Sequence, residues 1–488
     1  MKRSILLYPI LIGFFGFLIY LVIDSGKNLK PKSAQDITTG QIVSSTVEKT
    51  KPVVITSTES VWQQYLHNIK SPLGLLLLQI ITILFVSKLF GIIINKFRQP
   101  SVVGEMMAGI FLGPSIMGFI SPCFSAFLFP PNSLSNLQFL SQIGLAFFMF
   151  IIGMELDIEK LKGKAHNALV ISHASIIFPY FLGVLVSYFL YEQFAPANVS
   201  FIAFALFMGI AVSITAFPVL ARILQERNLT KTSIGAIAIA CAAFDDVTAW
   251  CILATVIAIV KAGSLVSALF TIMLAVVFVL LMFYAVRPWI KKTSSKYSDN
   301  KHLNKTFVAI AFFVLLLSAY ITETIGIHAL FGAFLAGVIM PQKSNIKVQL
   351  MEKIEDVSVL LLLPLFFAFT GLRTQIGLLN EGHLWATCGL IILIAVLGKF
   401  GGSAFAAKLT GQSWNDSFSI GALMNTRGLM ELIVLNIGYD LGVLSPALFA
   451  IMVIMALATT FMTGPLLDLI AYFERIKNAD VKEKLNVT

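Results

Sequence analysis

The chain has 488 residues, of which 57% are hydrophobic and only 12% are charged, and its mean hydropathy is +0.88. A soluble globular domain carries about twice that charged fraction, so the composition excludes an ordinary soluble enzyme or binding domain. The net charge of +10 does not indicate nucleic acid as a partner, because no basic cluster is interleaved with aromatic residues.

The apolar residues are gathered in segments of about 20 residues, the length that a helix needs to cross a bilayer. Fourteen such segments predict an all-α polytopic membrane protein with the lipid membrane as its surroundings. Their approximate boundaries are 5–23, 73–95, 99–118, 134–155, 168–191, 199–222, 232–260, 265–288, 305–323, 327–341, 356–372, 384–408, 415–438 and 446–472.

The loops between these segments predict an orientation. Most Lys and Arg residues fall in the loops that lie on the same side as the N-terminus. Basic residues in short loops favour the cytoplasmic side. We therefore expect a multi-pass protein of the plasma (inner) membrane with a cytoplasmic C-terminus, with residues 287–305 cytoplasmic and residues 119–133 external.

The chain divides into four parts. Residues 1–23 form an anchor helix or a signal peptide, because Met1-Lys2-Arg3 precedes an apolar run but Asp24 interrupts the expected cleavage site. Residues 24–72 form a polar external loop, residues 73–472 the transmembrane domain and residues 473–488 a short cytoplasmic tail.

Two aspartates and a lysine lie deep in predicted spans, where a charge is costly and tends to mark an ion or proton path. Asp245 and Asp246 stand at the centre of 232–260, and Lys399 stands in 384–408. Adjacent helical residues point about 100° apart, so one aspartate can line an ion path while the other faces a neighbouring helix. Lys399 is expected to pair with one of them. The alternatives are a mispredicted loop for the aspartates and a lysine whose long stem reaches the interface.

Two spans contain residues that interrupt a helix. Exposed carbonyl groups at membrane depth are tolerated where they line a cavity or are buried in protein, and paired interrupted spans indicate the site of an inverted-repeat transporter. Arg427 stands four residues before Glu431, so an intrahelical pair is the alternative to a role in the site. The polar residues of the two interruptions, which are candidates for cation coordination or helix crossing, are Ser213, Thr215, Asn425, Thr426 and Arg427.

Several strings of the chain resemble one family. They occur in family order over roughly residues 72–472 and are "GEMMAGIFLGPS" (104–115), "FFMFIIGMELD" (147–157), "ITAFPVLARIL" (214–224), "FDDVTAW" (244–250), "HALFGAFLAGVIMP" (328–341), "LPLFFAFTGLRT" (363–374) and "MNTRGLMELIVLNIG" (424–438). They are similar to the second branch of the cation/proton antiporter superfamily, in particular to the cation/proton exchangers of plants and bacteria.

This resemblance implies a sodium/proton antiporter fold of about 13 core helices, with an inverted repeat, two broken crossing helices, a homodimer and an elevator-like cycle. It places the ion-binding carboxylate at Asp246. It places at Asp245 a residue that is Asp in electrogenic sodium/proton members and Asn or Gln in others. Lys399 matches the basic residue that pairs with the first acid of double-aspartate members. The surrounding strings resemble exchangers that usually carry Asn at the position of Asp245, so cation preference and stoichiometry stay open.

The sequence thus predicts a secondary antiporter that exchanges sodium or potassium for protons, with no catalytic residues and no cofactor beyond the transported ions. A potassium efflux protein of the same superfamily is the alternative within transport. An intramembrane aspartyl protease is the alternative among enzymes, suggested by Tyr439-Asp440, although the GxGD motif is absent. The four cysteines show no metal-ligand spacing.

Overall fold

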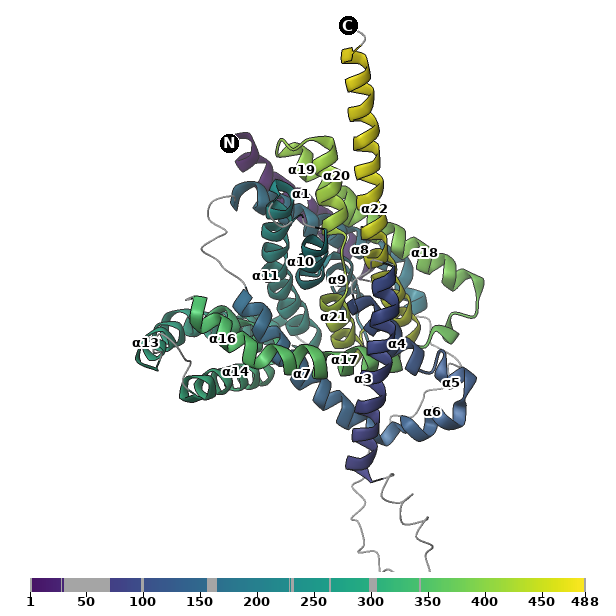
Figure 1. The fold of residues 1–488 in the computed structure, drawn as a ribbon, viewed down its shortest axis with the longest axis vertical. Coiled ribbons are helices and arrows are strands. Elements are labelled where there is room, and N and C mark those ends of the chain that lie inside the picture. Colours follow the sequence, from purple (N-terminus) through teal and green to yellow (C-terminus); the bar gives the residue numbers. More distant parts are fainter. Residues whose placement is uncertain are drawn as a thin grey trace, which may run out of the picture.

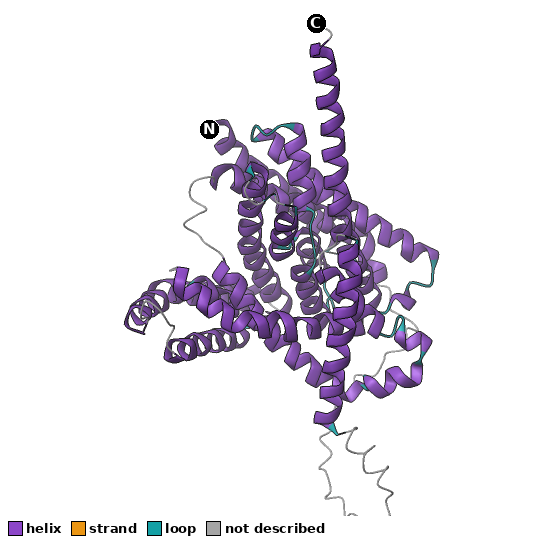
Figure 2. Ribbon diagram, viewed as in Figure 1, coloured by secondary structure: helices purple, strands orange, loops and turns teal. Residues whose placement is uncertain are grey.

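The computed structural model describes residues 2–27, 29, 71–97, 101–155, 165–227, 229, 232–262, 265–297, 305–341 and 344–486. In this part of the chain every regular element is a helix and no strand occurs (Figure 2). The prediction of an all-α fold is therefore confirmed. Most of the predicted polar loop 24–72 lies outside the described residues.

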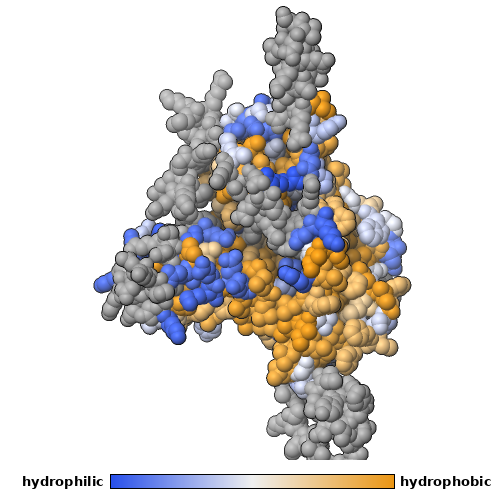
Figure 3. All heavy atoms as spheres, viewed as in Figure 1, coloured by the Kyte–Doolittle hydropathy of each residue, from blue (hydrophilic) through white to orange (hydrophobic). Residues whose placement is uncertain are grey.

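Among the described residues, ten helices are long and apolar enough to cross a membrane, or eleven with one pair that is bent by 43°. The shorter apolar helices Leu11–Gly26, Phe201–Ser213 and Ala329–Val338 lie in the three remaining predicted segments. The count of fourteen crossings stays a prediction. Large apolar side chains such as Phe85 and Phe189 are exposed, and Figure 3 shows a broad hydrophobic surface of the kind that lipid covers.

One set of helices packs mainly within itself and is called the first helix group. Within it α7 packs on α15, α4 packs on α3 and α17, and α14 packs on α15 (Figure 1). Its members are α3 (Pro72–Lys96), α4 (Ser101–Leu112), α7 (Leu134–Glu155), α14 (Lys305–Ile325), α15 (Ala329–Val338) and α17 (Leu363–Arg373).

Glycines bring helices of the first group into close contact. A Cβ on Gly153 of α7 would overlap the carbonyl oxygen of Phe334 in α15, and one on Gly337 of α15 would overlap that of Phe150 in α7. Small residues allow this approach, which is how helices associate in lipid without a hydrophobic driving force. Any larger residue at either glycine would separate the two helices.

Short elements lie between α4 and α7, between α12 (Leu265–Leu281) and α14, between α15 and α17, and between α17 and α18 (Gly382–Val396). They are α5 (Met117–Ile120), α6 (Pro122–Leu128), the 3₁₀ turns η1 (Pro131–Ser133) and η5 (Ile376–Leu378), α13 (Arg287–Tyr297), α16 (Ser344–Glu355) and the π-helical turns η3 (Met282–Val286) and η4 (Asp356–Leu362). The helix α12 (Leu265–Leu281) contacts α11 and α14 and so lies between the two groups.

The remaining helices form the second helix group, which holds all the candidate site residues. Here α8 packs on α9, α11 and α19, while α20 packs on α11, α19 and α22. Its members are α8 (Ala165–Phe194), α9 (Phe201–Ser213), α10 (Phe217–Glu226), α11 (Ser233–Ala262), α18 (Gly382–Val396), the π-helical turn η6 (Leu397–Gly401), α19 (Gly402–Leu409), α20 (Trp414–Met424), α21 (Leu429–Asp440) and α22 (Pro446–Asn486).

Both predicted interruptions are present, and they meet. The first separates α9 from α10 at residues 214–216, and the second separates α20 from α21 at residues 425–428. The backbone N–H of Ala216 donates to the carbonyl oxygen of Thr426 at 3.1 Å, so each break satisfies part of the other's backbone. The prediction of two broken helices that cross is confirmed.

At both ends of the chain the helix extends past the predicted span. Helix α1 (Lys2–Gly26) covers the predicted anchor 5–23 and packs on α8 and α9 of the second group, with the ring of Phe15 5.5 Å from that of Phe178. Helix α22 does not stop near residue 472 but continues to Asn486 through the predicted tail. The N-terminal end of α1 and the C-terminal end of α22 lie toward the same end of the molecule (Figure 1).

Candidate functional site

The two adjacent aspartates lie in the middle of α11 and have different surroundings. Asp245 is 0% exposed and Asp246 is 2% exposed. The helix continues for more than a turn on both sides, so the alternative of a mispredicted loop is wrong. Because neighbouring residues on a helix point about 100° apart, the two carboxylates face different helices.

Asp245 is held by four donors from three other parts of the second group. Ser172 donates to its Oδ1 at 2.6 Å, while Ser175 and Thr215 donate to its Oδ2 at 2.7 and 2.6 Å. The ammonium group of Lys399 lies 3.0 Å from the same Oδ2. A buried carboxylate with this many partners is a satisfied anion.

Lys399 lies in the π-helical turn η6 and is completely buried. Its Nζ donates to Asp245, to the carbonyl oxygen of Ser213 at 2.6 Å and to that of Ser175 at 3.0 Å. An ammonium group has three N–H donors, so these acceptors can use all of them. The expected pairing with an aspartate is thus observed with Asp245, and the alternative of a lysine that reaches the interface is wrong.

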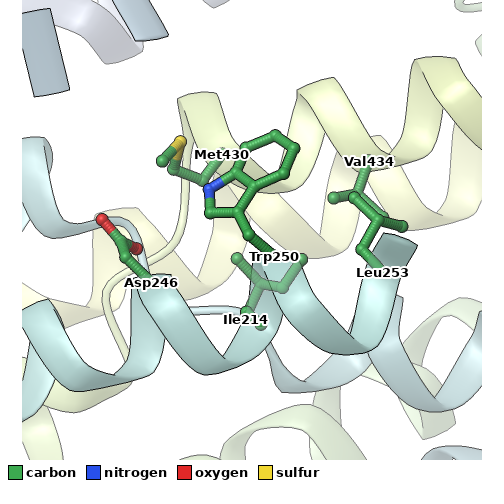
Figure 4. A pocket seen from close by; sticks show the side chains of 7 residues that line it. Ile214, Asp246, Trp250, Leu253, Met430 and Val434 are labelled. Carbon is green, nitrogen blue, oxygen red and sulfur yellow. The ribbon is translucent and has the colours of Figure 1, made fainter. Parts of the chain in front are cut away.

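Asp246 faces a small cavity whose other lining is apolar. The volume open to a water-sized sphere is about 10 Å³, close to the room that one water molecule needs. Its Oδ2 is buried and accepts no hydrogen bond from the described residues. The cavity is lined by Ile214, Asp246, Ala249, Trp250, Leu253, Met430 and Val434 (Figure 4).

Both broken helices contribute to this cavity. Ile214 belongs to the first break, and Met430 and Val434 belong to α21 directly after the second. The Trp250 ring stacks on that of Phe334 at 6.4 Å, which links the cavity wall to α15 of the first group. A movement of either break against α11 would therefore change the surroundings of Asp246.

Arg427 in the second break contacts neither aspartate. Its Nη1 lies 2.8 Å from Oε2 of Glu431, and both side chains are fully buried. The guanidinium also donates to the carbonyl oxygens of Ala211, at 3.2 Å, and Val212. These carbonyls belong to the last turn of α9, the negative end of that helix, so the cation both pairs with Glu431 and joins the two breaks.

The other candidate residues of the breaks have separate surroundings. Ser213 accepts from Lys399 through its carbonyl oxygen, whereas its hydroxyl donates to Ile210 at 3.0 Å. Thr215, a candidate for cation coordination or helix crossing, donates to Asp245. The Thr426 hydroxyl donates to that of Thr463 at 3.4 Å. The Asn425 side chain is fully buried, and neither its oxygen nor its nitrogen has a hydrogen-bond partner among the described residues.

Two residues that hold Asp245 were missed by the sequence prediction. Ser172 and Ser175 lie three residues apart on α8 and therefore on one face of that helix. This spacing within an apolar span was the available signal. No group of three His, Cys, Asp or Glu residues that could hold a metal ion occurs in the described parts of the chain.

Comparisons with known proteins identify the family of the chain. The family model described as sodium/hydrogen exchanger, transmembrane, matches residues 81–471. The chain is 42% identical over 393 residues to the Na(+)/H(+) antiporter NhaS4 of Synechocystis, which covers 80% of this chain and 96% of that protein. It is 42% identical over 395 residues to Cation/H(+) antiporter 17 of Arabidopsis thaliana, covering 81% of this chain and 48% of that protein.

A yeast relative and a solved structure extend the comparison. K(+)/H(+) antiporter 1 of Saccharomyces cerevisiae is 34% identical over 413 residues, with 83% of this chain and 47% of that protein covered. The chain thus spans about half the length of its plant and yeast relatives. The structure of the sodium proton antiporter MjNhaP1 from Methanocaldococcus jannaschii has the same fold, with a TM-score of 0.61, 14% identity and coverage of 80% of this chain and 95% of that one. The chain belongs to the sodium/hydrogen exchanger transmembrane family and is an antiporter of monovalent cations and protons.

Proposed function

We propose that Asp246 is the carboxylate at which a proton and a monovalent cation compete during exchange by alternating access. One observation carries this assignment. Asp246 has a buried oxygen without a hydrogen-bond partner in the described structure, whereas the neighbouring Asp245 accepts from four donors. A buried carboxylate oxygen that lacks a donor gains most from a proton or a cation.

The lining of the cavity supports a role in transport rather than storage of an ion. Apart from Asp246 it offers apolar side chains, so a cation there would complete its oxygen shell with water or with carbonyl groups that the breaks supply. Conduction and exchange need a site that binds well enough to fill and weakly enough to empty. A single carboxylate meets this requirement better than a closed cage of ligands.

The protein would work as a homodimer in the plasma membrane, with its C-terminus in the cytoplasm. The basic loops support this orientation, and the resemblance supports the dimer. Sodium and potassium are both candidates, since the related proteins are named for sodium/proton, potassium/proton and cation/proton exchange. A proteolytic role has no support, because Asp440 is paired with Arg373 at 2.6 Å instead of with a second acid.

The test is a cation-dependent pH change in proteoliposomes, measured with sodium, potassium and lithium. The unaltered protein should move protons in response to at least one of them, and Asp246→Asn should abolish the movement for all three. Asp468→Asn, which removes an acid of α22 that contacts Arg227, is the matched control and should still exchange. Appreciable exchange by Asp246→Asn would exclude this carboxylate from the mechanism.

A further inference from the structure

The end of α17 in the first helix group lies against the end of α21 in the second. The Nη1 of Arg373 is 2.6 Å from Oδ1 of Asp440, and the two side chains are 18% and 33% exposed. The guanidinium also lies 4.1 Å from the ring centre of Phe369 and 5.3 Å from that of Tyr439. Arg373 of the first group therefore contacts the second group through an ion pair with Asp440 and through the ring of Tyr439, and it packs on the ring of Phe369 in its own helix.

One turn deeper in the protein, a second polar contact joins the same two helices. The side-chain nitrogen of Asn436 donates to the Thr370 hydroxyl at 2.8 Å, and its oxygen accepts from Arg373 at 3.4 Å. Thr370 is 2% exposed and Asn436 is 7% exposed. Each side chain also donates within its own helix, Thr370 to the carbonyl oxygen of Phe366 and Asn436 to that of Leu432, so separation of the helices would break the contact between them and keep the local ones. Such polar contacts between helices favour their association in an apolar region.

We propose that Thr370, Arg373, Asn436 and Asp440 form a latch between the two helix groups, which closes the external side and must open in each exchange cycle. The proposal rests on the proposed function and on the predicted orientation, in which α17 and α21 both end on the external side. Other polar contacts, such as Arg227 with Asp468, join elements of one group and would not be broken by a relative movement of the groups.

The latch is placed where it controls access to Asp246. Val434, which lines the Asp246 cavity, lies two residues before Asn436 on α21, and Met430 lies one further turn inward. A path from the external side to the cavity along this wall requires α21 to move away from α17. That movement breaks the ion pair and the Thr370–Asn436 hydrogen bond together.

The experiment measures access to the cavity directly. In a protein whose native cysteines Cys123, Cys241, Cys251 and Cys388 are replaced, Val434→Cys is labelled from the external side with a membrane-impermeant thiol reagent. Arg373→Ala should raise the labelling rate about fivefold. This factor is the change in the open population that follows when an ion pair at the upper end of the energies measured for exposed pairs is lost. Asn436→Ala, which removes the deeper contact and no charge, should raise it as well.

Two further variants make the result specific. The double variant Arg373→Asp/Asp440→Arg restores an ion pair with the charges reversed and should bring the labelling rate back toward that of the parent. Arg227→Ala breaks an ion pair of the same 2.6 Å length inside the second group and should leave labelling unchanged. Equal labelling rates in the parent, Arg373→Ala and Asn436→Ala would overturn the latch, even in a protein that exchanges cations. Faster labelling in Arg373→Ala would support the latch even if the native protein exchanged none of the three cations, a result that would overturn the proposed function.

Discussion

The ammonium nitrogen of Lys399 lies 3.0 Å from Oδ2 of Asp245, with the two side chains 0% and 1% exposed. Asp245 has several other hydrogen-bond donors, whereas Lys399 has no other negatively charged partner among the described residues that contact it. Asp245 also accepts from three hydroxyl groups, whereas the other acceptors of Lys399 are uncharged oxygens of Ser175 and Ser213. Residues of α8 and of the first broken helix therefore surround the ion pair and hydrogen-bond to both of its members.

Neutralising either member of this pair should destabilise the protein strongly. Asp245→Asn removes the counter-charge of the buried Lys399, and Lys399→Met leaves Asp245 with hydroxyl donors alone. The expected loss is about 3–5 kcal/mol for a buried pair in soluble proteins. The double variant should lose less than the sum, which thermal unfolding in detergent measures as a double-mutant cycle. Strictly additive losses would show that the two charges do not interact.

The serines of α8 give a second stability prediction. Ser172→Ala and Ser175→Ala each remove a hydroxyl that donates to the Asp245 carboxylate, and each should cost about 1.5–3 kcal/mol, the value for a hydrogen bond to a charged group. Ser187→Ala is the matched control. Ser187 is a buried serine of the same helix whose hydroxyl donates to the carbonyl oxygen of Val184, so its loss should cost less. Equal melting temperatures for all three variants would contradict a role for the hydroxyls in holding Asp245.

The sequence was sufficient for the parts of this site that follow from local chemistry. Mid-span charges identified Asp245, Asp246 and Lys399, and polar residues within two apolar spans marked the two breaks. The sequence did not show which aspartate pairs with Lys399, because adjacent residues differ by about 100° around the helix and the neighbour on each side is unknown. For the same reason the hydrogen bond from the Thr215 hydroxyl to Asp245 was not predicted.

The first helix group was harder to anticipate than the second. Its close contacts depend on glycines such as Gly153 and Gly337, which meet across helices that are far apart in the sequence. Apolar periodicity shows that such helices are buried in protein or lipid but not which neighbours they have. The latch between Arg373 and Asp440 is equally non-local, since 67 residues separate its members.

The orientation can be tested with a native cysteine. Cys123 lies exposed on α6, within the segment predicted to be external. A protein that keeps Cys123 alone should react with a membrane-impermeant thiol reagent on intact cells. In the cysteine-free protein, Lys291→Cys on the exposed surface of α13 should react after permeabilisation only. Reaction of Lys291→Cys from outside, with Cys123 protected, would reverse the orientation.

The last prediction concerns the stoichiometry and follows from the hydroxyl groups around Asp245. A cation that replaces the proton of Asp246 leaves the local charge unchanged, but it attracts the adjacent Asp245 carboxylate and so competes with the buried Lys399 ammonium for that counter-charge. Lys399 can then release its proton while Ser172, Ser175 and Thr215 keep Asp245 hydrogen-bonded. Two protons would thus exchange for one cation, one at Asp246 and one at Lys399.

Such an exchange moves net charge, and the sign of its voltage response can be stated. Two protons that enter for each cation that leaves carry one positive charge inward, so a potential that is negative inside should accelerate cation efflux. Asp245→Asn removes the counter-charge that keeps Lys399 protonated, so this variant should exchange one proton per cation and ignore the potential, with lower thermal stability. The measurement is transport in proteoliposomes with potentials of either sign imposed. A native protein that exchanges cations at the same rate at both potentials would exclude the second proton, even if the Asp245–Lys399 pair is real.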